Sequence, residues 1–187
     1  MSKIKNIILD YGHGGIDSNG KYTTAPSKMF KFDNGDIAYE GVLNRQIGGL
    51  VERLLKCLKP DLNVLTTVQE SDPKDVSLYE RVQFANKFNK KETILVSIHS
   101  NASTSHKARG FEIFTTKGFT KSDILAEKIA NRVQELYNKI DLKLRFDTSD
   151  GDKDKEVDFY VLRKTTMPAV LLECLFFDNK EDFKKLK

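Results

Sequence analysis

Apolar and polar residues occur along this chain in blocks that predict strands and helices in alternation. Apolar runs rich in β-branched residues predict buried strands at 4–9, 62–68, 93–100 and 110–116. Two later runs, FYVL and AVLLEC, are interpreted as further short strands at 159–162 and 169–174. Since strands that alternate with helices form parallel sheets covered by those helices, the pattern predicts an α/β fold with a largely parallel sheet.

Helical spacing of apolar residues predicts the segments between these strands. A helix is expected to begin at Glu40, because Leu43, Ile47, Leu50 and Leu54 recur along one face. Its central Gly48–Gly49 pair fits close packing against a sheet. Further helices are predicted after the capping-box sequence SLYE at 77–80, over 122–140, and over NKEDFKKL at 179–186. The polar stretches 14–39 and 141–158 are predicted to be long loops.

Composition narrows the class of protein further. A length of 187 residues fits one domain, expected to span 1–187. The net charge of +4 favours contact with an anionic polymer such as a cell wall, while no basic tract interleaved with aromatics points to nucleic acid. Cys57 and Cys174 stand in apolar stretches and are expected to be buried free thiols. No signal sequence or membrane-spanning run is visible, so we expect cytoplasmic synthesis and no membrane insertion.

Two of the three histidines directly follow or end predicted strands. His13 follows the first strand and His99 ends the third, and ligands bind at the carboxyl ends of parallel strands. Two imidazoles and one carboxylate form a catalytic zinc set that leaves a position open for water. Glu40 suits the carboxylate position, with Asp10 and Asp17 as rival ligands.

A general base is also expected at a strand end. Glu173 stands at the end of the apolar run PAVLLE, where an unpaired charge is costly and burial raises a carboxyl pKa. Asn101 is a candidate substrate-binding residue because it follows His99 by two positions. His106 lies in the polar stretch STSHKARG and is not expected to be a ligand.

Several alternative motifs are absent or incomplete. The turn YGHGGIDSNG lacks the ending of a phosphate-binding loop and the glycine spacing of a dinucleotide fingerprint, and no HExxH sequence occurs. The acidic run DGDKDKE at 150–156 is similar to a calcium loop, but Lys155 and Val161 replace the glycine and the bidentate glutamate. We interpret it as a solvated loop.

These motifs together resemble a known family. LDYGHGG, YEGVLNRQI, LYERVQFANKF, SIHSNAS, GFEIFTT and VLRKTTMPAVLLECLFFDN occur in the order seen in zinc-dependent N-acetylmuramoyl-L-alanine amidases of the amidase-3 type. The resemblance covers residues 4–186. It implies a three-layer α/β/α fold around a mostly parallel sheet of about six strands. The sequence departs from the family pattern at Tyr11, Val68 and Cys174 and in the length of the loop after Gly14.

The resemblance also implies an activity. Hydrolysis of the amide bond between N-acetylmuramic acid and L-alanine of peptidoglycan is expected, with one Zn²⁺ held by His13, Glu40 and His99. Glu173 is expected to take a proton from the attacking water and pass it to the leaving nitrogen. The rival hypotheses are a zinc peptidase that cuts stem peptides and a non-catalytic wall-binding domain. A phage endolysin and a sporulation or germination amidase are both compatible with the sequence, which does not identify protein partners.

Overall fold

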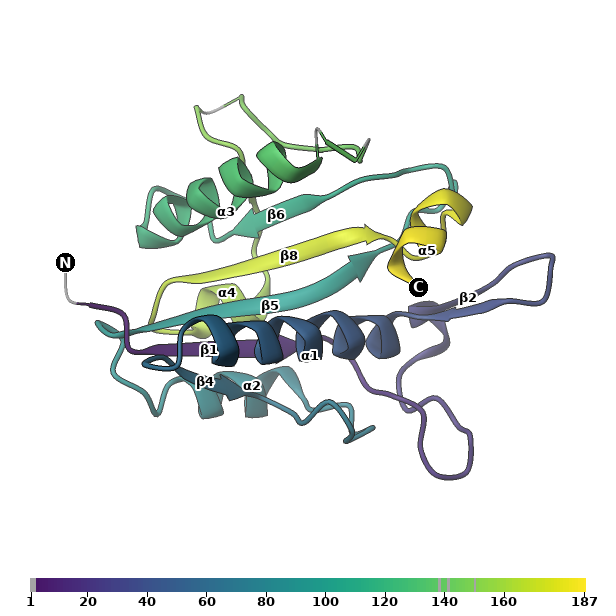
Figure 1. Cartoon of the computed structure of the whole chain (residues 1–187), viewed down its shortest axis with the longest axis horizontal. Helices are drawn as coiled ribbons and strands as arrows, with labels where there is room; N and C mark the ends of the chain where they lie inside the picture. The colour runs from purple at the N-terminus through teal and green to yellow at the C-terminus, as the bar shows by residue number, and fades with distance from the viewer. Residues whose placement is uncertain (1–2, 138, 141, 150) are drawn as a thin grey trace.

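A six-stranded sheet forms the centre of the protein (Figure 1). The computed structural model describes residues 3–137, 139–140, 142–149 and 151–187. The strand order is β4-β1-β5-β8-β6-β7, and every neighbouring pair is parallel except β6 with β8. The strands are β1 (Asn6–Tyr11), β4 (Asn63–Thr66), β5 (Thr93–Asn101), β6 (Glu112–Thr115), β7 (Lys155–Glu156) and β8 (Ala169–Phe176). The predicted mostly parallel, six-stranded sheet is therefore confirmed.

Helices cover both faces of this sheet. The helices are α1 (Glu40–Leu58), α2 (Leu78–Ala85), α3 (Lys121–Tyr137), α4 (Tyr160–Lys164) and α5 (Lys180–Leu186). In Figure 1, α1 and α3 lie in front of the sheet, and α2 and α4 lie behind it. Alternation along β8 explains the two layers, because Ala169 and Leu171 pack in the α2–α4 cluster while Val170 packs against α3. The predicted three-layer α/β/α architecture is confirmed.

The parallel strands deliver their last residues to one edge of the sheet. In the register, Asp10 of β1 lies opposite Ser97 of β5, and His99 of β5 lies opposite Glu173 of β8. A hairpin of β2 (Met29–Lys31) and β3 (Ile37–Tyr39), preceded by a 3₁₀ turn at Pro26–Lys28, lies at this end of the sheet (Figure 1). This edge therefore gathers polar side chains from segments far apart in sequence.

Two element predictions were wrong. The run FYVL is not a strand: residues from Tyr160 form α4, where the adjacent Val161 and Leu162 are both buried in the cluster shared with α2. The stretch 14–39 is not a continuous loop, because it contains the β2–β3 hairpin with Gly35 at φ +87° in its turn. A short apolar run does not distinguish strand from helix, and the Asn34–Gly35 turn signal was overlooked.

Other boundaries differ from expectation in smaller ways. The sixth strand is the two-residue β7, within the stretch predicted as a loop from 141 to 158. Asp141 and Asp150 of that loop, and Asn138 of the helix predicted over 122–140, lie outside the described residues. Cys57 is exposed and Cys174 is partly buried, so the prediction that both thiols are buried was wrong. Among the described residues, no helix combines the length and the apolar character that a membrane crossing requires.

The two central glycines of α1 have different neighbours. A Cβ on Gly48 would lie 2.2 Å from Cε1 of Tyr11, whose ring is fully buried, so this glycine permits the close approach of helix and sheet. A Cβ on Gly49 would instead meet the carboxylate of Glu70, whose side chain is 40% exposed. Only Gly48 therefore serves the packing that the sequence predicted for both.

These neighbours predict opposite effects of alanine. Gly48→Ala should destabilise the protein by about 1–3 kcal/mol, because the Tyr11 ring has no space to move. Gly49→Ala should be neutral or stabilising by up to about 1 kcal/mol, since Glu70 can swing into solvent and alanine favours helix. Urea denaturation of both variants measures the difference, and equal losses would contradict the packing described here.

Candidate functional site

Three side chains converge at the carboxyl-end edge of the sheet. His13 follows β1, Glu40 begins α1, and His99 lies near the end of β5. One ligand atom from each lies within 4.8 Å of the others. Glu40 Oε1 is 3.2 Å from His13 Nε2 and 3.0 Å from His99 Nδ1, so one carboxylate oxygen faces both imidazoles.

Glu40 reaches this position because the β2–β3 hairpin leads directly into α1. The first turn of the helix packs against the turn after β1 so closely that a Cβ on Gly41 would lie 1.8 Å from the Gly14 carbonyl oxygen. One turn later, the buried Asn44 donates to the Gly12 carbonyl at 3.1 Å and accepts from the Ser100 hydroxyl at 3.1 Å. The start of α1 is therefore joined to the ends of both β1 and β5.

His13 has a left-handed backbone conformation with φ +65°. Non-glycine residues adopt this conformation at a cost, so the surrounding contacts must hold it. Two arginines do so: the His13 carbonyl accepts from Arg45 Nη1 at 2.8 Å and from Arg81 Nη2 at 3.3 Å. These bonds fix the backbone at the point where the imidazole turns toward Glu40.

Arg81 also forms a buried ion pair beneath this turn. Its Nη1 donates to Asp10 Oδ1 and to the Tyr11 carbonyl, each at 2.6 Å. Asp10 further accepts from the hydroxyls of Ser97 and Thr67. Burial acts to raise the pKa of Asp10, but Arg81 and these hydroxyls outweigh it and hold the pKa below 3.8. Asp10 is therefore ionised and fully engaged in the structure.

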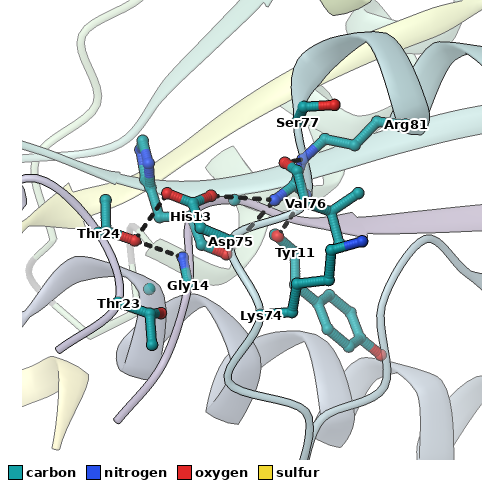
Figure 2. Close-up of polar contacts among 12 residues, drawn as sticks. Tyr11, His13, Gly14, Thr23, Thr24, Lys74, Asp75, Val76, Ser77 and Arg81 are labelled. Atoms are coloured by element: carbon teal, nitrogen blue, oxygen red, sulfur yellow. Dashed lines mark hydrogen bonds and ion pairs between the residues drawn. The ribbon is translucent and has the colours of Figure 1, made fainter. Parts of the chain in front are cut away.

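Two loops complete the surroundings of His13. Figure 2 shows Thr24 lying between the backbone of Gly14 and the carboxylate of Asp75. Asp75 in turn lies 3.7 Å from Arg81 Nη2. Beside this network a cleft of about 330 Å³ opens, lined by His13, His99 and the segment from Asp75 to Leu78. The imidazoles therefore face a space that a substrate could enter.

Close packing sets the orientation of the His99 ring. A Cβ on Gly12 would lie 2.2 Å from His99 Cε1, so only glycine allows this ring to lie against the end of β1. The rings of His13 and His99 meet edge to face, with centroids 4.9 Å apart. Among the described residues, neither imidazole hydrogen-bonds to a carbonyl or to any carboxylate other than Glu40. Packing therefore has the larger part in positioning both rings.

The electrostatics of the three residues suit metal ligation. Burial acts against ionisation of Glu40, but His13 and His99 outweigh it and hold its pKa well below the usual range. Burial lowers the pKa of His13, which favours the neutral imidazole that metals bind. For His99 burial also acts to lower the pKa, but Glu40 outweighs it and the pKa is raised. His13 Nε2 is buried and makes no hydrogen bond, which leaves it available as a ligand.

Glu173 lies beside this group on the neighbouring strand. It stands opposite His99 in the β5–β8 register, which places adjacent strands about 4.8 Å apart. Its Oε2 is buried without a hydrogen-bond partner. Burial raises the pKa of Glu173 to about 8, with His99 opposing and Glu40 reinforcing the shift. A carboxyl that titrates near neutrality next to a candidate metal centre suits proton transfer.

The other candidate residues are engaged in contacts of their own. Asp17 accepts backbone hydrogen bonds from Asn19 and Lys21 in its own turn, and neither it nor Asp10 belongs to the converging group. His106 lies 2.8 Å from Asp178 and is likewise outside that group. Asn101 Nδ2 donates to Glu112 at 2.6 Å, so its amide braces β6, and its substrate-binding role stays a prediction.

Sequence reasoning missed the residues that hold the site. Arg45, Arg81 and Asn44 are buried polar residues of helices, and Lys28 lies with its Nζ 3.3 Å from Glu40 Oε2. Asn44 and Arg45 stand four and five residues after Glu40, so one helical turn places them near the same edge. Arg81 lies on the same side of its helix as Leu78 and Val82. A charged residue among apolar positions of a helix indicates a buried ion pair, and this pattern could have identified Arg81.

The sequence of this chain is similar to those of known cell wall amidases. The family model described as N-acetylmuramoyl-L-alanine amidase, Amidase_3, matches residues 7–187. An uncharacterised cell wall amidase of Bacillus anthracis is 35% identical over 97% of this chain, and the endolysin of Bacillus phage SPP1 is 32% identical over 100% of it. The matches cover 32% and 59% of those relatives, so this chain spans only part of their length.

A solved structure has a closely similar fold. The N-acetylmuramoyl-L-alanine amidase from Clostridium difficile 630 superposes with a TM-score of 0.76 at 28% identity, over 99% of this chain and 87% of that one. The fold and the converging side chains define an α/β protein with a candidate metal centre at the carboxyl ends of its strands. With the family model matching nearly its whole length, the chain belongs to the amidase-3 family of N-acetylmuramoyl-L-alanine amidases.

The buried pair beneath His13 gives a stability prediction. Arg81→Met should destabilise the protein by about 3–5 kcal/mol, because it leaves the Asp10 charge buried without its partner. Adding Asp10→Asn to that variant should recover part of the loss, since the uncompensated charge is then removed. Urea denaturation of the two single variants and the double variant measures the coupling, and simple additivity of the two losses would contradict the pairing.

Proposed function

We propose that this chain hydrolyses the amide bond between N-acetylmuramic acid and L-alanine of peptidoglycan, with one Zn²⁺ at His13, Glu40 and His99. The observation that carries the proposal is the convergence of these three side chains beside Glu173 at the carboxyl ends of the strands. Family membership and the amidase and endolysin names of its relatives support the same substrate.

The donor set fits zinc. Two imidazole nitrogens and a carboxylate oxygen are ligands that Zn²⁺ prefers, and three protein ligands leave a fourth position for water or substrate. Ligands about 2.0–2.2 Å from a tetrahedral zinc lie roughly 3.3 Å from one another. The separations of 3.0 and 3.2 Å between Glu40 Oε1 and the two imidazoles are close to that spacing.

The roles that we propose for the metal and for Glu173 follow from the positions of the side chains. When bound, Zn²⁺ supplies Lewis-acid polarisation of the scissile carbonyl and makes water at the site more acidic. Glu173 accepts a proton from the attacking water at its carboxylate and delivers that proton to the departing alanine nitrogen. A nearby dication lowers the pKa of Glu173 from the value set by burial, which favours the carboxylate that accepts the proton.

The cellular setting that we propose is the cell wall. The relatives that support it are a cell wall amidase and a phage endolysin, and both names describe action on peptidoglycan. We propose that the chain is synthesised in the cytoplasm and acts on the wall after release or lysis. The cleft beside His13 and His99 would receive the muramoyl–alanine junction of the substrate.

Product analysis tests the reaction. Purified sacculi digested by the protein should keep intact glycan chains and release peptides that begin with L-alanine, as read by mass spectrometry. Peptides that begin at a later residue would instead indicate a stem-peptide peptidase. No released products from a zinc-loaded protein would indicate a wall-binding domain and would contradict the proposal.

Removal of the proposed ligands should remove both metal and activity. His13→Ala and His99→Ala should each lose stoichiometric zinc and sacculus hydrolysis, because two ligands do not form a closed site. His106→Ala is the matched control: it removes the third histidine, which lies outside the group, and should keep both. Elemental analysis and a turbidity assay measure the two properties, and zinc retained by the first two variants would argue against these ligands.

Replacing the proposed base should separate metal binding from catalysis. Glu173→Gln should keep one zinc per chain but lose activity by about 10²–10⁴-fold, because the amide does not accept the proton. Glu112→Gln is the control for local charge, since Glu112 lies opposite Glu173 in the β6–β8 register. A comparable loss in both variants would show that general electrostatics, and not proton transfer by Glu173, accounts for the effect.

A further inference from the structure

A second group of acidic side chains lies far from the site described above. Asp123 in α3 and Asp152 and Asp154 in the segment before β7 each offer an oxygen, and these oxygens lie within 4.8 Å of one another. Two of them, Asp123 and Asp154, contact the Thr115 hydroxyl at the end of β6. Since β6 runs antiparallel to β8, this end of β6 points to the opposite edge of the sheet from Glu173.

Asp123 and Asp154 are deeply buried, and few hydrogen-bond donors reach their carboxylates. Asp154 is 1% exposed, Asp123 is 4% exposed and Thr115 is fully buried. The Thr115 hydroxyl contacts both Asp123 Oδ1 and Asp154 Oδ2, yet it has one proton and can donate fully to only one of them. Asp154 Oδ1 is buried and accepts no hydrogen bond from a described residue.

The two buried carboxylates also have no cationic partner among the described residues. No ion pair joins Asp123 or Asp154 to a lysine or arginine within the described part of the chain, and the nearby Lys153 pairs with Glu127 instead. Burial, opposed by the hydrogen bond from Thr115 and reinforced by the charges of Asp152 and Asp123, raises the pKa of Asp154 to about 6. Such a shift indicates that the neighbouring carboxylates repel one another, and a divalent cation between them would relieve that repulsion.

Asp123 has a structural role besides this. The Thr120 backbone N–H donates to Asp123 Oδ2, and Thr120 Oγ1 accepts from the Ser122 backbone, which forms a cap at the start of α3. This cap accounts for one oxygen of Asp123. It does not account for Asp154, whose buried Oδ1 accepts no hydrogen bond and is therefore available as a cation ligand.

We propose that Asp123, Asp152 and Asp154 bind a divalent cation of the oxygen-preferring kind, Ca²⁺, at a site separate from the candidate zinc centre. Carboxylate oxygens are the ligands that Ca²⁺ prefers, and a set without nitrogen or sulfur is unsuited to tight zinc binding. Two oxygens about 2.3–2.6 Å from one Ca²⁺ lie at most about 5 Å apart, so the separations within this group suit one ion.

This site differs from the calcium loop that the sequence resembles. A calcium loop that began at residue 150 would have Lys155 at its turn glycine and Val161 at its bidentate glutamate. The interpretation of this stretch as a solvated loop was wrong for Asp154, which is buried. Instead, two of its aspartates are joined by Asp123 from a helix about thirty residues earlier. Only the fold brings these ligands together.

A cation bound here would stabilise one edge of the sheet. It would join α3 to the segment that leads into β7, whose two residues pair with Phe114 and Thr115 of β6. A two-residue edge strand gains little stability from its own hydrogen bonds, so a bound cation that links it to α3 would contribute to its stability. The cation would thus stabilise the fold without taking part in amide hydrolysis.

Calcium binding to the zinc-loaded protein tests the proposal. Isothermal titration at pH 7.5 should show one Ca²⁺ per chain, with a Kd of about 10⁻³ M or tighter. The Tm should rise by several degrees in excess Ca²⁺, because the ion binds only the folded state. Asp154→Asn should weaken binding at least 10-fold and abolish the rise in Tm, while zinc content stays unchanged.

Two further variants make the result decisive. Asp147→Asn is the matched control, since Asp147 is an exposed turn residue outside the group and should leave Ca²⁺ affinity unchanged. Asp152→Asn replaces Asp154→Asn should the latter fail to fold. Absence of Ca²⁺ binding by the unmodified chain, or equal affinity in the folded Asp154→Asn or Asp152→Asn variant, would overturn the proposal. Neither result would bear on the zinc site or on the proposed hydrolysis.

Discussion

The buried ion pair between Asp10 and Arg81 is the interaction on which the site most depends. The guanidinium of Arg81 contacts the last residues of β1 through Asp10 and the Tyr11 carbonyl, and it also contacts the His13 carbonyl two residues later. It therefore fixes both the end of the strand and the left-handed residue that follows. Without this fixed turn, the His13 imidazole would have no defined direction toward Glu40.

Around that turn, each converging side chain comes from a different kind of element. His99 is carried by a central strand and is held against a glycine that leaves room for its ring. Glu40 is carried by the first turn of a helix, where the positive end of the helix dipole favours its charge. Glu173 comes from the next strand and is placed by sheet register. Rigid elements thus supply the precision that a metal centre requires.

Much of this arrangement could be predicted from the sequence, because it depends on local patterns. Apolar runs and helical spacing indicated the parallel sheet, and the positions of His13 and His99 at strand ends indicated the edge where ligands gather. The choice of Glu40 over Asp10 needed the family resemblance. In the structure Glu40 lies with the two histidines, whereas Asp10 is paired with Arg81. The helical state of residues 160–164 was missed because it depends on packing against α2, which a short apolar run does not reveal.

The partners of buried polar residues were the least predictable part. Arg45 and Arg81 act through backbone carbonyls distant in sequence, and no spacing rule connects them to His13. The burial of Asp154 was equally hidden, because its neighbours Thr115 and Asp123 belong to other elements. In an acidic, hydrophilic stretch the sequence indicates solvent exposure, and only the three-dimensional arrangement shows that a carboxylate faces inward.

The central claim is that His13, Glu40 and His99 share one zinc ion. Anomalous diffraction at the zinc absorption edge, from crystals of the zinc-loaded protein, tests it most directly. We expect a single strong peak about 2.0–2.2 Å from His13 Nε2, a Glu40 carboxylate oxygen and His99 Nδ1. A peak that lies away from these three residues, or no peak in protein that contains one zinc per chain, would contradict the account.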